Sequence, residues 1–237
     1  MKLFAVHSPA FAKLWEPFKR SVETRTSFEL HAEELPARFD GCYWGQPVYH
    51  EMLRWLVERR LRLLESETEV FATSGIDTEF WRDAVPDLTA RMDSFWPNDL
   101  LGADDKNFPP RLCSCLYVMR PTDSVRALMK AVLDDPRCGP EIDDPILNEK
   151  RDMVKWSALP HSLYWNTSVG WKVGDPLPPL PFEVFWTHFN WTSNLVDKFA
   201  LAEAVRAEWH TQHRSFIGTN VARAATDSGC RSDSTGK

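Results

Sequence analysis

The stretch FATSGIDTEFW, Phe71 to Trp81, joins an apolar run to acidic residues directly behind it. The run that begins at Val70 has the composition of a buried strand. It ends at the small residue Gly75, and the carboxylates of Asp77 and Glu79 follow at once. Acidic side chains at the mouth of an apolar strand either shape a turn or hold something that needs negative charge.

Strands and helices alternate along the rest of the chain, which predicts an α/β fold with a mostly parallel central sheet flanked by helices. Strands are expected at 2–6, 27–35, 69–73, 111–120, 154–160 and 184–191. Helices are expected at 10–22, 48–65, 124–135, 145–153 and 193–213, with a partly helical segment at 80–96 and a loop at 98–110. One domain is expected over 1–217, followed by a disordered tail at 218–237 that lacks apolar periodicity.

The bulk composition narrows the function classes. A net charge of −6 argues against general nucleic-acid binding, which needs a basic face. No secretory signal and no apolar run long enough to span a bilayer is recognised, so a cytoplasmic protein without a transmembrane segment is expected. Eleven tryptophans and 17 prolines are typical of aromatic-walled loops around a pocket.

The cysteines are interpreted as reduced thiols, because their number is odd and their spacing is not that of a zinc site. They are Cys42, Cys113, Cys115, Cys138 and Cys230.

Three arginines lie close together on the amphipathic helix predicted at 48–65. Arg59, Arg60 and Arg62 are interpreted as its solvated face rather than a phosphate site, because charged side chains usually face water.

Further candidates lie in three later segments. In EIDDPILNEK, Asp143 and Asp144 either cap the following helix or face a sugar hydroxyl or reacting carbon. In LPHSLYWN, Tyr164 and Trp165 belong either to an aromatic lip or to the core.

The third segment, FWTHFNWTSNLVDKF, carries a histidine behind a predicted strand and a lysine ten residues later. His188 is either structural or a metal ligand. Lys198 has the charge to neutralise a leaving phosphate. Asn190 and Trp191 lie between them in the sequence.

Taken in order, five segments resemble the motifs of the nucleotide-diphospho-sugar transferases, which are glycosyltransferases of the GT-A type. They are GIDTEFW, CSCLYVMRPTDSVRALMKAVL, DDPILN, LPHSLYWN and THFNWTSNLVDK, and the resemblance spans residues 2–200. In that family the first segment is an Asp-x-Asp motif whose second aspartate binds a metal with the late histidine. Here Gly75 replaces the first aspartate, while Asp77 and His188 keep that pair.

The family pattern is also broken at Pro145, where a glutamine is usual, and at Cys113–Cys115, which lacks the usual glycine. The missing first carboxylate weakens the predicted metal site, since a hard cation binds through its oxygen ligands.

The resemblance implies a single GT-A-like domain that transfers a sugar from a nucleotide-diphosphate sugar, a UDP-sugar in the first instance. Asp77 and His188 would hold Mn²⁺ or Mg²⁺ against the diphosphate, and Lys198 would add positive charge. Asp144, with Asp143 as second choice, would contact the donor sugar or the acceptor hydroxyl.

The donor's remaining contacts follow from the same resemblance. Val6, His7 and Ser8, at the end of the first predicted strand and in the loop behind it, would touch the base or ribose. Trp165 and Trp191 would stack on sugar or base, with Asn190 beside them. The acceptor, whether a glycan, a small molecule or a protein, is not specified by any motif.

Three alternatives remain open from the sequence. Gly75 favours a degenerate transferase fold that binds a nucleotide sugar or a protein without turnover. A metal-dependent phosphoesterase using Asp77, Asp143, Asp144 and His188 lacks the paired histidine motifs that a two-metal site needs. A pure interaction protein would explain the tryptophans and prolines but leave the motif order to chance.

Overall fold

The computed structural model describes residues 1–43, 45–104, 110–140, 143–167, 171–190, 192 and 194–228, with side chains through His213. Its main sheet has six strands in the order β2-β1-β3-β6-β5-β7. They are β1 (Lys2–His7), β2 (Glu29–Glu34), β3 (Phe71–Ser74), β5 (Leu100–Asp104), β6 (Leu112–Met119) and β7 (Trp156–Leu159). Strand β6 runs antiparallel to both of its neighbours, whereas the β1–β2, β1–β3 and β5–β7 pairs are parallel. The predicted mostly parallel α/β sheet is therefore confirmed.

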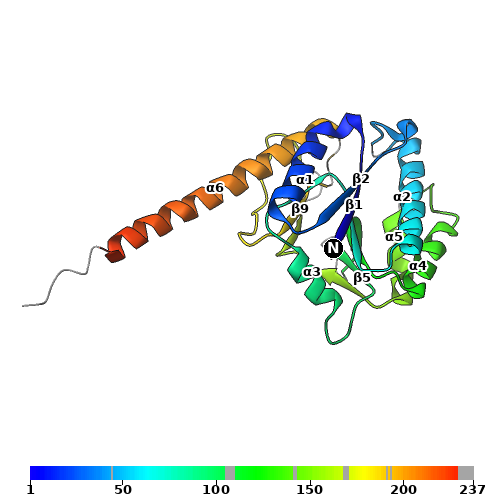
Figure 1. The fold of residues 1–237 in the computed structure, drawn as a ribbon. Coiled ribbons are helices and arrows are strands. Elements are labelled where there is room, and N and C mark those ends of the chain that lie inside the picture. The colour runs from blue at the N-terminus through cyan, green and yellow to red at the C-terminus, as the bar shows by residue number, and fades with distance from the viewer. Residues whose placement is uncertain are drawn as a thin grey trace, which may run out of the picture.

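Helices cover both faces of this sheet (Figure 1). They are α1 (Ala12–Arg25), α2 (Pro47–Ser66), α3 (Val85–Met92), α4 (Asp123–Leu133), α5 (Asp143–Lys150) and α6 (Leu195–Ser228). Short 3-10 helices lie at Pro9–Phe11, Ala37–Phe39 and Arg151–Met153.

Alternating strand residues divide the core into two layers. Leu3, Ala72 and Leu116 pack in one cluster that also contains residues of α1 and α3. Phe4 and Phe71, their neighbours in sequence, pack in the other cluster against α2, α4 and α5. Successive side chains of a strand point to opposite faces, so a central strand with helices on both sides has to be apolar throughout.

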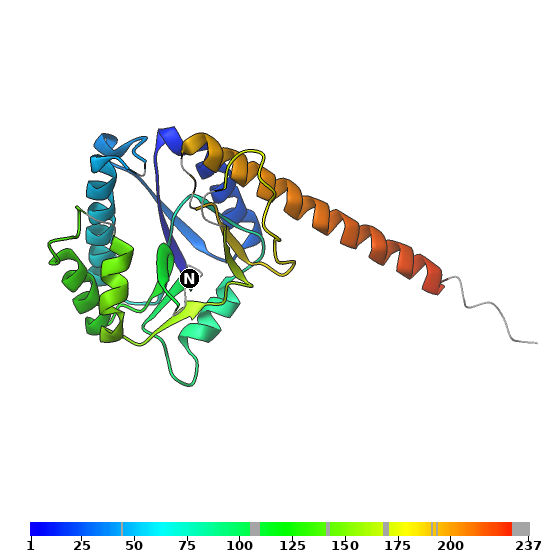
Figure 2. The ribbon, with the colours of Figure 1, turned by 180° about the vertical axis from the view of Figure 1, so that it is seen from behind.

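A second, three-stranded sheet has the order β4-β9-β8. Its strands are β4 (Thr78–Phe80), β8 (Tyr164–Asn166) and β9 (Trp186–His188). Strand β4 of this sheet packs against α1, and α6 runs outward from the same side of the domain (Figure 2). The small sheet begins one residue after Asp77 and ends at His188, so it brings the two predicted site residues together.

The predicted loop at 98–110 was wrong in its first half, because β5 is a buried strand between β6 and β7. The sequence GADD resembles a turn, but Gly102 serves close packing instead. A β-carbon at position 102 would lie 3.0 Å from Cβ of Leu112 and 3.0 Å from Cε1 of Tyr117. Glycine within a strand often marks such a close approach.

Helix α6 extends to Ser228, past the predicted end of the domain at 217. Its last part contains the alanine-rich stretch VARAAT, and alanine has the highest helix propensity. The rest of the predicted tail, 229–237, lies outside the described residues. None of the helices in the described part of the chain is long and apolar enough to cross a membrane.

Candidate functional site

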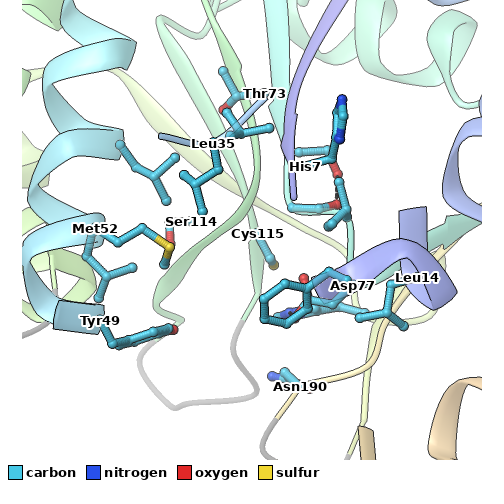
Figure 3. Close-up of a pocket in the computed structure, with 18 of the residues that line it drawn as sticks. His7, Leu14, Leu35, Tyr49, Met52, Thr73, Asp77, Ser114, Cys115 and Asn190 are labelled. Atoms are coloured by element: carbon cyan, nitrogen blue, oxygen red, sulfur yellow. Dashed lines mark hydrogen bonds and ion pairs between the residues drawn. The ribbon is translucent and has the colours of Figure 1, made fainter. Parts of the chain in front are cut away.

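A cavity of about 700 Å³ lies at the edge of the sheet where β1 and β3 end (Figure 3). Because β6 runs the other way, its first residues reach the same edge, and the amide of Gly75 donates to the carbonyl of Cys115 at 2.9 Å. Leu35, Tyr49 and Met52 form an apolar wall on the side of α2. The cavity thus has the position at which ligands bind in open α/β sheets.

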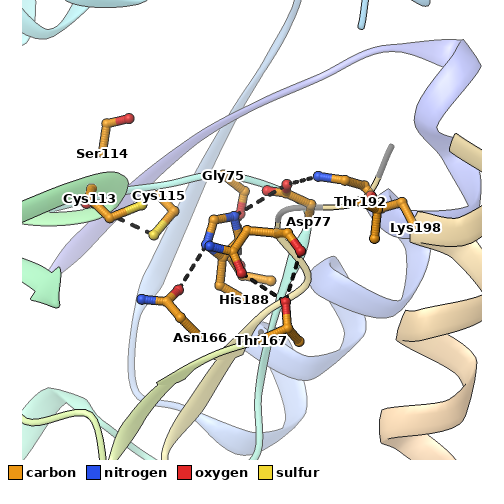
Figure 4. A network of polar contacts seen from close by, with 12 residues as sticks. Gly75, Asp77, Cys113, Ser114, Cys115, Asn166, Thr167, His188, Thr192 and Lys198 are labelled. Carbon is orange, nitrogen blue, oxygen red and sulfur yellow. Dashed lines mark hydrogen bonds and ion pairs between the residues drawn. The ribbon is translucent and has the colours of Figure 1, made fainter. Parts of the chain in front are cut away.

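Asp77 stands at the centre of the polar side of this cavity (Figure 4). Its Oδ2 accepts a hydrogen bond from the ammonium of Lys198 and lies 3.3 Å from Nε2 of His188. Lys198 belongs to the first turn of α6, and His188 ends β9. The sequence prediction that these three residues share a site is consistent with this placement.

Strand pairing explains why His188 faces Asp77. Thr78 pairs with His188 across β4 and β9, and the amide of Phe189 donates to the Asp77 carbonyl at 2.8 Å. On the other edge of the imidazole, Nδ1 lies 2.9 Å from Oδ1 of Asn166. The ring is therefore held from both edges.

The charges of the three groups depend on one another. Burial would raise the pKa of Asp77, but the charges of Lys198 and His188 hold it well below its ordinary range. Burial would lower the pKa of His188, yet the Asp77 carboxylate raises it to about 9. The pKa of Lys198 is raised in the same way, against the effect of burial. A half-buried carboxylate between two buried cations has the charge balance of a stable ionised cluster.

Glu79, the second acid behind β3, does not face the cavity. It is buried in β4 and lies 3.3 Å from Nη1 of Arg25 and 2.6 Å from Nε of Arg206. This ion-paired group joins α1, β4 and α6, so the role of Glu79 is structural.

We expect Glu79→Ala to lower the free energy of unfolding by about 2 to 3 kcal/mol, because it leaves two partly buried guanidinium groups without their carboxylate. The control is Glu23→Ala, whose exposed partner Lys19 lies 4.0 Å away. That change should cost no more than about 0.5 kcal/mol. Urea denaturation of the three proteins measures both values, and equal stabilities would contradict the structural role.

Asp143 and Asp144 begin α5 and both line the cavity, but they have different partners. Asp143 is buried and ion-paired with Nη1 of Arg60 at 2.8 Å. Oδ1 of Asp144 accepts from the amide of Ser114 at 3.0 Å and from the hydroxyl of Tyr117 at 3.3 Å. Burial raises the pKa of Asp144 well above its ordinary range, with the charges of Cys113 and Asp143 as further causes.

The sequence interpretation of the α2 arginines was wrong for two of the three. Arg59 and Arg60 are buried and line the cavity, whereas Arg62 is exposed as expected. Arg59 is held by Glu33 at 2.6 Å, and Arg60 by Asp143. Their partners lie 26 and 83 residues away in sequence, so a single-helix pattern gave no signal for their burial.

The end of β1 and the residue after it also reach the cavity. Val6, His7 and Ser8 line it, and the His7 ring stacks on Trp15 with centroids 4.3 Å apart. Asn190 lines it as well, and its Oδ1 accepts from the hydroxyl of Thr167 at 2.8 Å.

Of the predicted aromatic residues, Tyr164 and Trp165 pack in the core. Trp165 is buried with Trp81 and Leu180, and the hydroxyl of Tyr164 donates to Asp87 at 2.9 Å. The stacking role that the resemblance implies for Trp165 is therefore wrong, because its ring is packed against the protein rather than into the cavity. Trp191 lies outside the described residues.

The donor atoms around Asp77 do not fit a Mn²⁺ or Mg²⁺ ion, which prefers several oxygen ligands. Oδ2 of Asp77 already has two cationic partners. A β-carbon at Gly75, where the family has its other aspartate, would lie 2.7 Å from Oδ1 of Asp77. Within the described part of the chain, three possible metal ligands lie close together, and they offer sulfur and nitrogen instead of oxygen. They are Cys113, Cys115 and His188.

Solved structures share the architecture that surrounds this site. The bifunctional glycosyltransferase WbbM aligns with a TM-score of 0.54 and 10% identity over 79% of this chain and 45% of its own. The glycosyltransferase GlyE of Streptococcus pneumoniae aligns with a TM-score of 0.51 and 14% identity over 80% of this chain and 55% of its own. The chain has a glycosyltransferase fold.

This likeness confirms the GT-A-like fold that the motif order predicted. The chain spans about half the length of these two structures. No protein-family model and no curated protein matches its sequence.

Proposed function

We propose that this protein transfers a sugar from a nucleotide-diphosphate sugar, with a UDP-sugar as the first candidate donor. The observation that carries the proposal is the cluster of Lys198, Asp77 and His188 at the ligand-binding edge of a glycosyltransferase fold. The cavity of about 700 Å³ falls within the size range of small-molecule sites.

Lys198 is the proposed partner of the donor's diphosphate. Its ammonium lies in the wall of the cavity. A positive charge beside the departing diphosphate stabilises the negative charge that develops there. The donor atoms around Asp77 do not suit a hard divalent ion. Lys198 is therefore proposed to neutralise the charge on the departing diphosphate in place of a metal ion. Asp77 then fixes the position and charge of this lysine. Mn²⁺ or Mg²⁺ at Asp77 and His188 stays a prediction that the binding experiment below decides.

The other ends of the donor are assigned by position in the cavity. Val6, His7 and Ser8 lie on the far side of β3 from β6, and they are proposed to contact the base or ribose, with Asn190 beside them. Asp144 lies at the opposite side, on α5, and is proposed to contact the donor sugar or the acceptor hydroxyl. The acceptor is a glycan, a small molecule or a protein.

The second candidate function is a binding module that retains nucleotide sugar without turnover. The observation in its favour concerns the two carboxylates of the Asp-x-Asp motif. Gly75 stands in place of the first, and the second, Asp77, is already paired with Lys198 and His188. Both candidate functions use the same donor site. A transferase releases the nucleotide from the donor, whereas a binding module does not.

We expect UDP to bind in the presence of a chelator, because Lys198 supplies the positive charge. Lys198→Met should weaken binding about 10- to 100-fold, the worth of a hydrogen bond to a charged group. Calorimetric titration with UDP, run with EDTA and then with Mn²⁺, measures both effects.

The matched control is Lys172→Met, which removes an exposed lysine and should leave the affinity for UDP unchanged. Binding that needs Mn²⁺ would reinstate the predicted ion at Asp77 and His188. Absence of binding by UDP and by other nucleoside diphosphates in every condition would refute the transferase proposal.

For the chemical step, Asp144→Asn should lower the rate of UDP release from the donor by about 100-fold, because a neutral amide cannot stabilise the positive charge that develops on the sugar in an oxocarbenium-like transition state. Its affinity for UDP should stay within about threefold of the wild type. Asp134→Asn, at an exposed acid paired with Lys130 at 3.4 Å, serves as the control. Wild-type protein that binds UDP but releases none from any UDP-sugar would favour the binding module.

A further inference from the structure

The geometry points to a site for a thiophilic metal ion, Zn²⁺ in the first instance, formed by Cys113, Cys115 and His188. One ligand atom from each residue lies within 4.8 Å of the other two. All three side chains are buried and line the cavity. This site shares His188 with the Asp77–His188 site that the family resemblance implies, but its other two ligands are thiols instead of a carboxylate. Its existence does not depend on the donor proposed above.

The fold assembles the three ligands from two sheets. Cys113 and Cys115 are two positions apart on β6, so their side chains leave the same face of that strand. His188 ends β9 in the small sheet, more than 70 residues later. Figure 4 shows the two thiols beside the imidazole ring, with Ser114 between them in sequence pointing away. A Cys-x-Cys spacing with no histidine nearby in sequence gave no zinc signal, because the third ligand is brought in by β-sheet pairing.

The ligand set determines the class of ion. Two thiols and one imidazole are soft and borderline donors, which Zn²⁺ prefers and Mg²⁺ or Mn²⁺ does not. Bond lengths of about 2.0 to 2.3 Å place the ligand atoms of a tetrahedral zinc roughly 3.5 to 3.8 Å apart. The observed limit of 4.8 Å therefore requires two ligand atoms to approach each other by about 1.3 Å at most, which small side-chain rotations supply.

The surroundings of His188 are those of a ligand held in place by outer contacts. Nε2 faces the Asp77 carboxylate at 3.3 Å, and Nδ1 faces Oδ1 of Asn166 at 2.9 Å. Metal-binding histidines commonly have such an oxygen partner on the ring nitrogen that does not bind the metal. When the ion binds one ring nitrogen, the contact at that nitrogen is lost. The contact at the other nitrogen remains and orients the ring.

Three protein ligands leave a fourth tetrahedral position, as in zinc sites that remain open to an exogenous ligand. Since Cys113, Cys115 and His188 all line the cavity, this position faces the space that a ligand would occupy. An oxygen of water or of an anionic ligand would complete the coordination.

The first test uses the wild-type chain under reducing conditions, after removal of metal with a chelator. Titration with Co²⁺ as a spectroscopic substitute should produce a thiolate-to-cobalt charge-transfer band that saturates at one ion per chain. Zn²⁺ should abolish the band by displacement, whereas Mg²⁺ should not. The absence of a thiolate band would overturn the inference, and this readout requires neither a variant nor a nucleotide.

The second test measures the Zn²⁺ affinity of variants by competition with a chromophoric chelator. Cys113→Ser, Cys115→Ser and His188→Gln should each weaken binding by more than about 100-fold, since even an outer contact is worth 10- to 100-fold. Cys138→Ser is the matched control, because Cys138 is also a buried thiol but packs in the cluster around α4. Unchanged affinity in both cysteine variants would assign any bound zinc to other residues and overturn the inference. Because UDP is absent from both tests, their failure leaves the transferase proposal untouched.

Discussion

The ion pair between Asp77 and Lys198 is the constraint on which the arrangement of the site depends. It joins the turn after β3 to the first turn of α6, across 121 residues of sequence. Lys198 is buried, and a buried ammonium without its carboxylate would be strongly destabilising, so the lysine requires Asp77 to be in place. The same carboxylate orients His188, which fixes the end of the small sheet relative to the main one. One charged contact thereby sets the positions of three elements around the cavity.

The reversed direction of β6 explains the unusual chemistry of the opposite wall. In an all-parallel sheet, the edge beyond β1 and β3 would meet only the carboxyl ends of strands. Here the first residues of β6 arrive at that edge, and they carry Cys113 and Cys115. The amide of Ser114 also holds Asp144 at the start of α5. The antiparallel direction of β6 therefore places both the thiols and the candidate sugar-binding acid, Asp144, at this edge of the sheet.

Much of the site follows from sequence where a residue lies just beyond a strand. Asp77 was singled out because it follows an apolar run, and His7 because of the family resemblance, and both line the cavity. The order of loose motifs added His188 and Lys198. Patterns within one element failed where the deciding partner is distant. Arg60 looked like a solvated helix residue because its partner, Asp143, belongs to another helix. Strand β5 looked like a loop because Gly102 accommodates Leu112 and Tyr117, which no local pattern reveals.

The turn at Gly75 has a consequence for how such a site changes in evolution. Any side chain at this position would begin 2.7 Å from an Asp77 oxygen whose carboxylate is fixed by Lys198 and His188. A change to aspartate would therefore meet a steric conflict before it gained a ligand. Such a substitution requires the Asp77 carboxylate to move, and its contacts with Lys198 and His188 to rearrange with it.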